Sequence, residues 1–276
     1  MSEALPESLA IIAGKGVYPR ELAVSARKEG VKRIEAIAFR RETHRGIERC
    51  VDKVHWIALG QLGAMLDVFR QAGITKAVMA GQITPTHIFN IRLDRPMLDL
   101  LARVPVKNAE TVFGAVGDEL RAVGVELMPA SAFMESSMPD AGQLTKREPS
   151  EKERGDIDLG LQIAKATSGL DIGQTVVIKD GIVIAIEALE GTDATILRAG
   201  KLAGQGGVVV KVAKRGHDMR FDIPVVGMHT MKTLRKSKAA VLAMEAKRTI
   251  VLEREKVVAE AERLGIAMVA VKVENH

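Results

Sequence analysis

Short apolar runs alternate with glycine turns and helix-like segments through the first half of the chain. Ser8–Ala13 is apolar, Gly14-Lys15-Gly16 follows, and a helical pattern runs from Pro19 to Glu29 and stops at Gly30. A strand, a glycine turn and a helix in this order open a parallel α/β unit. The same patterns predict strands at 34–39, 54–59, 76–80 and 125–128, and helices at 61–71, 94–104 and 109–123.

The second half begins with a predicted helix at 156–167 and a hairpin. Asp180-Gly181 separates the apolar runs 175–179 and 182–187, and an Asp-Gly pair between two such runs is a strong hairpin signal. Both runs are apolar at successive positions, which predicts a buried hairpin. The remaining pattern predicts helices at 192–203, 229–238 and 254–264, strands at 208–212, 249–253 and 267–273, and an extended run at 220–223.

A shift in composition divides the two halves. Residues 135–153 are rich in Ser, Pro, Asp, Gly, Lys and Glu, which is typical of an exposed connection. We therefore expect an N-terminal domain at 1–134, a linker at 135–155 and a C-terminal domain at 156–276. The predicted fold class is α/β, with a Rossmann-like parallel sheet in the first domain, a mixed sheet in the second, and the site in the cleft between them.

Composition narrows the range of functions. Of the 276 residues 47% are hydrophobic and only 3% aromatic, so the core is aliphatic, and a base-stacking surface for single-stranded nucleic acid is disfavoured. The net charge of +5 fits a phosphate-bearing ligand, an anionic membrane face, or simply a mixed surface. One cysteine, Cys50, allows no intramolecular disulfide and indicates a reducing cytoplasm. The acidic first residues do not form a signal peptide, and no apolar window is long enough to span a membrane.

The candidate chemistry gathers in residues 187–227, where five carboxylates lie among predicted strands. Asp222 beside Arg220 suits Mg²⁺ or a positioned water, or is a structural ion pair. Thr192 and Asp193 have helix-start chemistry, Thr192 as a cap. Lys211 and Lys214 suit phosphate binding, or are solvated at a strand edge.

A second set of candidates lies in the first domain. Gly14, and Gly81 with Gln82, follow the predicted strands at 8–13 and 76–80. Ligands in open α/β sheets bind beyond the carboxyl ends of strands, so these residues contact a ligand through the backbone or form tight turns. The six histidines show no metal-ligand spacing, so any Mg²⁺ would be held by oxygen atoms.

The order of these motifs resembles a known family. Residues 11–16 with Pro19, then Leu170-Asp171-Ile172-Gly173-Gln174, residues 185–193 containing Glu190-Gly191-Thr192-Asp193, and Arg220-Phe221-Asp222-Ile223-Pro224 are similar to those of the LpxI-type UDP-2,3-diacylglucosamine pyrophosphatases. The resemblance covers nearly the whole chain.

The resemblance implies Mg²⁺-dependent hydrolysis of UDP-2,3-diacylglucosamine to UMP and 2,3-diacylglucosamine 1-phosphate, in lipid A biosynthesis. It also implies a cytoplasmic protein at the inner membrane and a homodimer. No nucleic-acid partner is expected, given the few aromatic residues. The family's essential aspartate falls on Asp222, and Asp193 with Asp222 would contact the metal. The expected substrate-binding residues are Gly14, Gly81, Gln82, Gln174, Thr192, Lys211, Lys214 and Arg220.

The chain departs from the family pattern at Lys107-Asn108-Ala109-Glu110-Thr111, where the family carries a Gly-Asp-Asp-like segment, and at His217, where it often has Gln. One alternative is therefore a non-catalytic protein that binds a nucleotide-sugar or phospholipid. A second alternative is a nicotinamide-dependent oxidoreductase, because Arg40-Arg41 follow the second strand and would suit a 2′-phosphate.

Overall fold

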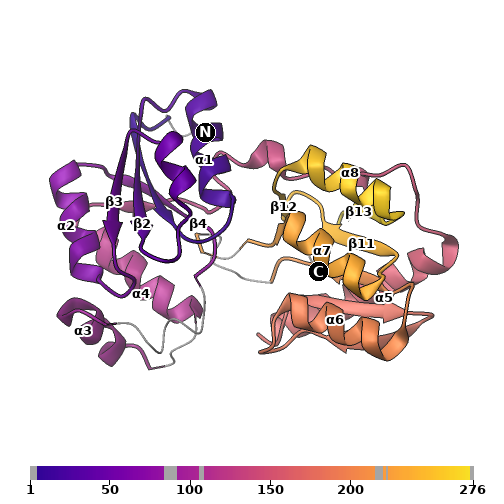
Figure 1. Ribbon diagram of the computed structural model, residues 1–276. Coiled ribbons are helices and arrows are strands. Elements are labelled where there is room, and N and C mark those ends of the chain that lie inside the picture. Colours follow the sequence, from indigo (N-terminus) through magenta and orange to yellow (C-terminus); the bar gives the residue numbers. More distant parts are fainter. Residues whose placement is uncertain (1–4, 84–91, 106–108, 215–219, 222, 274–276) are drawn as a thin grey trace. The chain divides into compact units, whose positions relative to one another are not determined.

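The computed structural model describes residues 5–83, 92–105, 109–214, 220–221 and 223–273. The chain divides into two compact units (Figure 1). Met1–Met134 with Asp218–Asp222 form the first unit, and Glu135–His217 with Ile223–His276 form the second. Each contains one main sheet flanked by helices, so the predicted α/β class is confirmed.

The sheet of the first unit is wholly parallel, with the order β3-β2-β1-β4-β5. Its strands are β1 (Ser8–Ala13), β2 (Arg33–Phe39), β3 (Lys53–Ile57), β4 (Lys76–Ala80) and β5 (Glu126–Leu127). The strand order reverses between β1 and β4, which therefore border the crevice where doubly wound sheets bind ligands.

Helices cover both faces of this sheet, since buried parallel strands need cover on both sides. Ala10 and Ile12 of β1 face a core built with α2 (Leu62–Ala72), α3 (Arg95–Arg103) and α4 (Ala109–Ala122). Leu9 and Ile11 alternate with them and are fully buried on the other face. There α1 (Tyr18–Glu29) contacts β1 and β4.

A buried carboxylate joins β2 to β3. The Glu35 side chain is only 6% exposed and accepts hydrogen bonds from His55 Nε2 at 2.6 Å and from Arg33 Nε at 2.9 Å. Burial alone would raise the pKa of Glu35, but the hydrogen bonds and charges of His55 and Arg33 outweigh it, and the pKa is lowered.

The main sheet of the second unit is mixed, in the order β6-β13-β11-β9-β7-β8. β9 (Val208–Lys211), β11 (Val241–Glu245) and β13 (Ala267–Val271) are parallel. β7 (Thr175–Lys179) runs antiparallel to β9 and forms a hairpin with β8 (Ile182–Ile186). Asp180 and Gly181 have φ of 56° and 75°, as a two-residue hairpin turn requires. β6 (Gly142–Gln143) closes the far edge.

Four helices sandwich this sheet. α6 (Thr192–Ala203), α7 (Met228–Ser237) and α8 (Arg254–Leu264) bury one face, and α5 (Glu151–Gly169) buries the other. Beside the sheet, η3 (Glu135–Ser137) lies near a two-stranded sheet of β10 (Val225–Val226) and β12 (Ile250–Val251). The short 3-10 helix η1 (Arg45–Arg49) belongs to the first unit. No helix among the described residues is long and apolar enough to cross a membrane.

Four local predictions were wrong. β11, central in its sheet, was missed. α5 starts at Glu151 rather than 156, because Ser150 and Glu153 form a capping box. β8 is an edge strand with Ile182 63% exposed, so the hairpin is not buried on both sides. Arg220 and Phe221 lie in a turn rather than an extended run.

The crossing of α6 and α7 gives a stability prediction. An added Cβ at Gly200 would lie 2.7 Å from Ser237 Cα, whereas one at Gly155 in α5 would meet nothing within 4 Å. We expect Gly200→Ala to lower the free energy of unfolding by about 2 kcal/mol, because backbone cannot yield easily. Gly155→Ala should raise it by roughly 0.5–1 kcal/mol, because alanine favours helix. Urea unfolding followed by circular dichroism measures both, and a stabilising Gly200→Ala would contradict the crossing.

The pKa of Glu35 gives a pH prediction. Its folded-state pKa lies below the unfolded value of about 4.3, so its stabilisation is present above that pH and is lost as the pH falls through the folded pKa. We expect Glu35→Gln to cost about 2 kcal/mol at neutral pH and less at acidic pH. Trp56 fluorescence during urea unfolding reports on this unit. Glu126→Gln, at an exposed ion pair, should cost less than about 0.5 kcal/mol.

Candidate functional site

Polar side chains converge at one edge of the second unit's main sheet. β8, β9 and β11 all end at this edge, and β7, which runs the opposite way, begins there. α6 begins immediately after β8, so its N-terminus lies at the same edge. Ligands of α/β sheets bind beyond the carboxyl ends of parallel strands. The topology therefore predicts a ligand site at this edge.

Three side chains form a row across the strands at this edge. Glu187 N donates to Thr175 O at 2.8 Å, and Thr175 is the register partner of Lys211 on β9. Residues directly opposite one another project from the same face of a sheet. Glu187 is 8% exposed, Lys211 9% and Thr175 0%, so an acid and a base are buried together on the face that α6 and α7 cover.

Thr192, the first residue of α6, links the members of this row. Its hydroxyl donates to Glu187 Oε1 at 2.9 Å, Lys211 Nζ donates to Thr192 Oγ1 at 3.4 Å, and the Thr175 and Thr192 oxygens are 3.3 Å apart. An ammonium group only donates and a carboxylate only accepts. Thr192 must therefore give its single proton to Glu187 and accept from Lys211 and Thr175.

This arrangement corrects the expected role of Thr192. The N-cap of α6 is Gly191, with φ of 80°, and no side chain caps the helix. The Thr192 hydroxyl instead connects a buried carboxylate to a buried ammonium group. Lys211, for which a solvated strand edge was one alternative, is buried within the row.

Two buried oxygens at this edge have no hydrogen-bond partner among the described residues. They are Glu187 Oε2 and Gln174 Oε1, at the end of β8 and just before β7. The backbone at Gly173 packs closely against the backbone at Glu187. A Cβ added at Gly173 would lie only 2.1 Å from Glu187 O. A buried acceptor without a donor is costly, so both oxygens are suited to a donor or cation supplied by a ligand.

Asp193 is engaged by α7. Its two carboxylate oxygens accept from His229 Nε2 at 2.9 Å and from Thr233 Oγ1 at 2.8 Å. Asp193 thereby ties the N-terminal turn of α6 to the first turns of α7. Its expected contact with a metal ion stays a prediction.

A buried ion pair lies on the opposite face of the same sheet, and the sequence did not predict it. Lys165 Nζ on α5 contacts Glu245 Oε2 at 2.6 Å, and both side chains are at most 7% exposed. Glu245 Oε2 also accepts from Ala213 N at 2.9 Å, and Lys165 Nζ donates to Ala213 O at 2.9 Å. The pair therefore holds the segment after β9, which leads from Lys211 toward Lys214.

The rim of this edge carries paired charges. Lys214 Nζ donates to Asp171, in the loop before β7. Glu190 Oε1 accepts from Arg198 at 2.6 Å, and that hydrogen bond lowers the pKa of Glu190. The rim is thus held in place by pairs whose net charge is small.

Two of the predicted site residues belong to the first unit by their contacts. Arg220 and Phe221 group with the first unit, where the Phe221 ring stacks on Phe113 at 6.4 Å between centroids and Arg220 lies 4.9 Å above the Phe221 ring. Gly117 of α4 also lies beside Phe221. Asp222, the expected catalytic residue, lies outside the described residues, as do His217, Asp218 and the departure at Lys107-Asn108.

Gly14, Gly81 and Gln82 lie together in the first unit, at the carboxyl ends of β1 and β4. Lys15 N donates to Gln82 O at 2.6 Å, and a Cβ at Gly14 would lie 2.6 Å from Gln82 O. A Cβ at Gly81, whose φ is 90°, would lie 2.5 Å from Lys15 O. Both glycines are required for the two loops to touch, and a contact with ligand stays a prediction.

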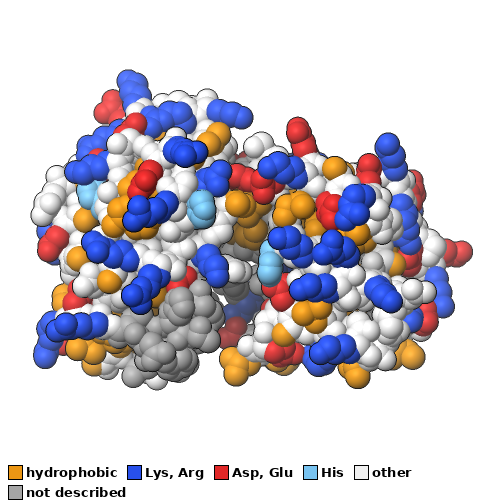
Figure 2. Space-filling view, in the orientation of Figure 1, with side chains coloured by type: hydrophobic (Ala, Val, Ile, Leu, Met, Phe, Trp, Pro, Cys, Tyr) orange, Lys and Arg blue, Asp and Glu red, His pale blue; other side chains and the backbone are white. Residues whose placement is uncertain are grey.

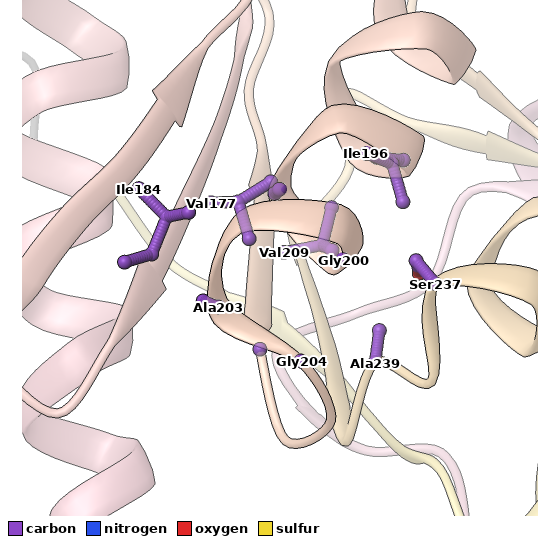
Figure 3. A pocket seen from close by; sticks show the side chains of 11 residues that line it. Val177, Ile184, Ile196, Gly200, Ala203, Gly204, Val209, Ser237 and Ala239 are labelled. Carbon is purple, nitrogen blue, oxygen red and sulfur yellow. The ribbon is translucent and has the colours of Figure 1, made fainter.

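The second unit also has a small apolar pocket, shown in Figure 3. It is lined by Ala203 and Gly204 at the end of α6, Gly207 before β9, Ser237 at the end of α7 and Ala239 after it, with Val177, Ile184 and Ile196. These residues lie at the amino ends of the parallel strands, opposite the polar row. The pocket has no polar group suited to chemistry on an anion.

Comparison with known proteins assigns each half of the chain to a family domain. Residues 8–137 match the model "LpxI N-terminal domain", and residues 140–269 match the model "LpxI C-terminal domain". The chain belongs to the LpxI family. The polar row and Thr192 thus lie in the LpxI C-terminal domain, and Gly14 with Gly81 in the LpxI N-terminal domain.

One curated relative aligns over almost the whole length. It is "UDP-2,3-diacylglucosamine pyrophosphatase LpxI" of Caulobacter vibrioides, 29% identical over 274 residues that cover 95% of this chain and 97% of the relative. A solved structure titled "Structure of glycinamide-RNase-transformylase T from Mycobacterium tuberculosis" is 17% identical over 66% of this chain and 44% of that one, with a TM-score of 0.26. A likeness at this TM-score carries no inference.

The hydrogen bonds of Thr192 give a prediction. Thr192→Val keeps the shape but leaves the buried Glu187 carboxylate without its donor, which should lower the free energy of unfolding by about 2 kcal/mol. Thr192→Ser keeps the hydroxyl and should cost less than about 1 kcal/mol. Urea unfolding followed by circular dichroism compares the two. Equal stability of the valine and serine variants would show that the hydroxyl does not hold Glu187.

Proposed function

We propose that this chain is a hydrolase that cleaves the pyrophosphate bond of UDP-2,3-diacylglucosamine to give UMP and 2,3-diacylglucosamine 1-phosphate, in lipid A biosynthesis. The observation that carries the proposal is the presence of both LpxI domains in order. The Caulobacter relative, aligned from end to end, bears the name of that activity. The buried polar row supplies groups of the chemical type that such a reaction needs.

The diphosphate places the main demand on the site. Phosphoryl transfer requires positioning and neutralisation of oxygen charges more than covalent help from the protein. Lys211 is a positive charge that Thr192 and its partners hold at the carboxyl edge. Because Lys211 is already held in one conformation, little further side-chain entropy would be lost when it binds a phosphate oxygen. Lys214, Gln174 and Arg220 remain proposed substrate contacts.

The residues of the polar edge can be compared with the ligands that Mg²⁺ needs. The described residues hold no group of three or more His, Cys, Asp or Glu side chains that could bind a metal. The unpartnered buried oxygens of Glu187 and Gln174 are nevertheless the kind of donor that Mg²⁺ takes, and Mg²⁺ often completes its shell with water and substrate phosphates. Glu187 and Gln174 would therefore supply part of the ligand set that holds the ion. A bound Mg²⁺ would neutralise charge on the diphosphate.

Asp222 keeps the proposed catalytic role, either orienting the attacking water or contacting the metal. The support for it is the Arg220-Phe221-Asp222-Ile223-Pro224 motif. Asp193 is a weaker metal candidate, because His229 and Thr233 occupy its oxygens. We also propose that the protein is cytoplasmic, meets the inner membrane peripherally and forms a homodimer.

The direct test is hydrolysis of UDP-2,3-diacylglucosamine by the purified full chain with Mg²⁺, followed by release of UMP. Asp222→Asn should lower kcat by about a thousandfold, the scale of a group that acts only in the transition state. Asp158→Asn, at an exposed position of α5, is the matched control and should stay within twofold, roughly the wild-type rate. Equal turnover by Asp222→Asn and wild type would sink the catalytic assignment.

Failure of the wild-type chain to turn over this substrate, with tight binding of the product across several divalent cations, would favour the non-catalytic alternative. The oxidoreductase alternative rests on Arg40-Arg41 alone, whereas both LpxI domains support the hydrolase. A thermal shift with NADPH would be needed to revive it.

A further inference from the structure

The outward surface of α6 and α7 carries an unusual concentration of positive charge. Exposed basic side chains lie along both helices, and Figure 2 shows Lys and Arg gathered over them. We call this the α6–α7 surface and define it by Arg198, Lys201, Lys232, Arg235 and Lys236.

The spacing of these residues places them on one side of the helix layer. On α7, Lys232, Arg235 and Lys236 are exposed while Met231 and Leu234 are fully buried against the sheet. On α6, Arg198 and Lys201 are exposed while Ile196 and Ala199 are buried. The two helices pack against one another, and Gly200 closely approaches Ser237. Their outward faces therefore form one continuous surface.

The positive charge of this surface does not simply reflect the net positive charge of the whole chain. Across both helices the only acidic residue is Asp193, whose oxygens are taken by His229 and Thr233. α8, which covers the same face of the sheet, carries three acidic and three basic residues. α5 carries four acidic and three basic residues. Balanced helices in the same unit show that the imbalance is local to α6 and α7.

Most of this charge has no carboxylate beside it. In the part of the chain that the structure describes, Lys201, Lys232 and Lys236 form no ion pair. Arg198 is paired with Glu190. The charge of Arg235 contributes to the lowered pKa of Glu260 on α8, but Glu260 forms its ion pair with Arg263, at 2.7 Å. The surface therefore keeps a net positive field.

Large aliphatic side chains lie exposed at the C-terminal end of α6. Leu202 is 67% exposed, and Ile182, on the edge strand that α6 contacts, is 63% exposed. Lysines beside exposed aliphatics suit an interface that is anionic at its surface and apolar beneath. A nucleic acid would use the charge but has no use for the aliphatics, and α6 and α7 carry no Phe, Tyr or Trp ring to stack on a base.

We propose that the α6–α7 surface is where the protein docks on an anionic lipid bilayer. The basic side chains would contact lipid phosphates, and Leu202 with Ile182 would enter the interfacial region. The N-termini of both helices lie at the edge that carries Thr192 and Asp193. A bilayer along this surface would thus lie about one helix length or less from the candidate site. This last point rests on the proposed lipid-linked substrate, but the docking itself does not.

The test is sedimentation of the full chain with substrate-free vesicles of phosphatidylethanolamine, with and without phosphatidylglycerol. We expect binding only when phosphatidylglycerol is present, and weaker binding at high salt. The double variant Lys232→Glu with Lys236→Glu should bind at least about 25-fold more weakly, since each basic residue near an anionic leaflet contributes about fivefold. Leu202→Asn should weaken binding by about fivefold.

The matched control is the double variant Lys32→Glu with Lys53→Glu, which makes the same change of net charge at exposed positions of the first unit. It should bind vesicles within about threefold of wild type. Circular dichroism checks that all variants are folded. Equal weakening by both double variants would overturn the proposal, as would binding of a single-stranded RNA oligonucleotide without vesicle binding.

The outcome is separable from that of the hydrolysis assay. A protein that docks on these vesicles but does not hydrolyse UDP-2,3-diacylglucosamine would defeat the proposed function alone. A protein that hydrolyses it but ignores anionic vesicles would defeat the docking proposal alone.

Discussion

The burial of the Glu187 carboxylate is the constraint around which the second unit is arranged. A carboxylate removed from water is tolerated only if donors replace the lost solvation, and here the donor is the hydroxyl of Thr192. That bond requires α6 to begin directly beside the end of β8. Lys211 and Thr175 then complete the environment of Thr192 from the neighbouring strands. One buried charge therefore accounts for the placement of a helix, a base and a row across three strands.

The same arrangement has a chemical use. The carboxylate is satisfied on one oxygen and left without a partner on the other, and a nearby amide oxygen is in the same state. A fully satisfied cluster would be purely structural, whereas buried acceptors left open at the carboxyl edge of a sheet suit a ligand. The Lys165–Glu245 pair serves the structure on the opposite face, because it fixes the segment that follows Lys211. The Lys165–Glu245 pair on one face thus stabilises the fold. On the other face, Glu187 keeps one carboxylate oxygen that a ligand could contact.

Local signals predicted much of the fold. Asp180-Gly181 located the hairpin, and glycines at 30 and 73 end α1 and α2 in the left-handed conformation. β11 was missed because its run of mixed aliphatic residues, Val241–Glu245, has no turn signal of its own. Ser150 and Glu153 form the capping box that starts α5. The polar composition around them instead favoured a linker. The exposure of β8 could not be read from its residues, since an apolar edge strand and an apolar central strand look alike.

The sequence by itself determined the class of fold, the turns and the motifs that resemble LpxI, because each depends on residues close together along the chain. Only the tertiary structure decided which charges meet. Glu187 follows β8, Thr175 begins β7 and Lys211 ends β9, so their meeting depends on the strand order and register. Phe221, so near Lys211 in sequence, stacks on Phe113 in the other unit. Long-range pairing follows from the cost of leaving a buried charge or an apolar ring unpartnered, and that cost exists only once the chain has folded.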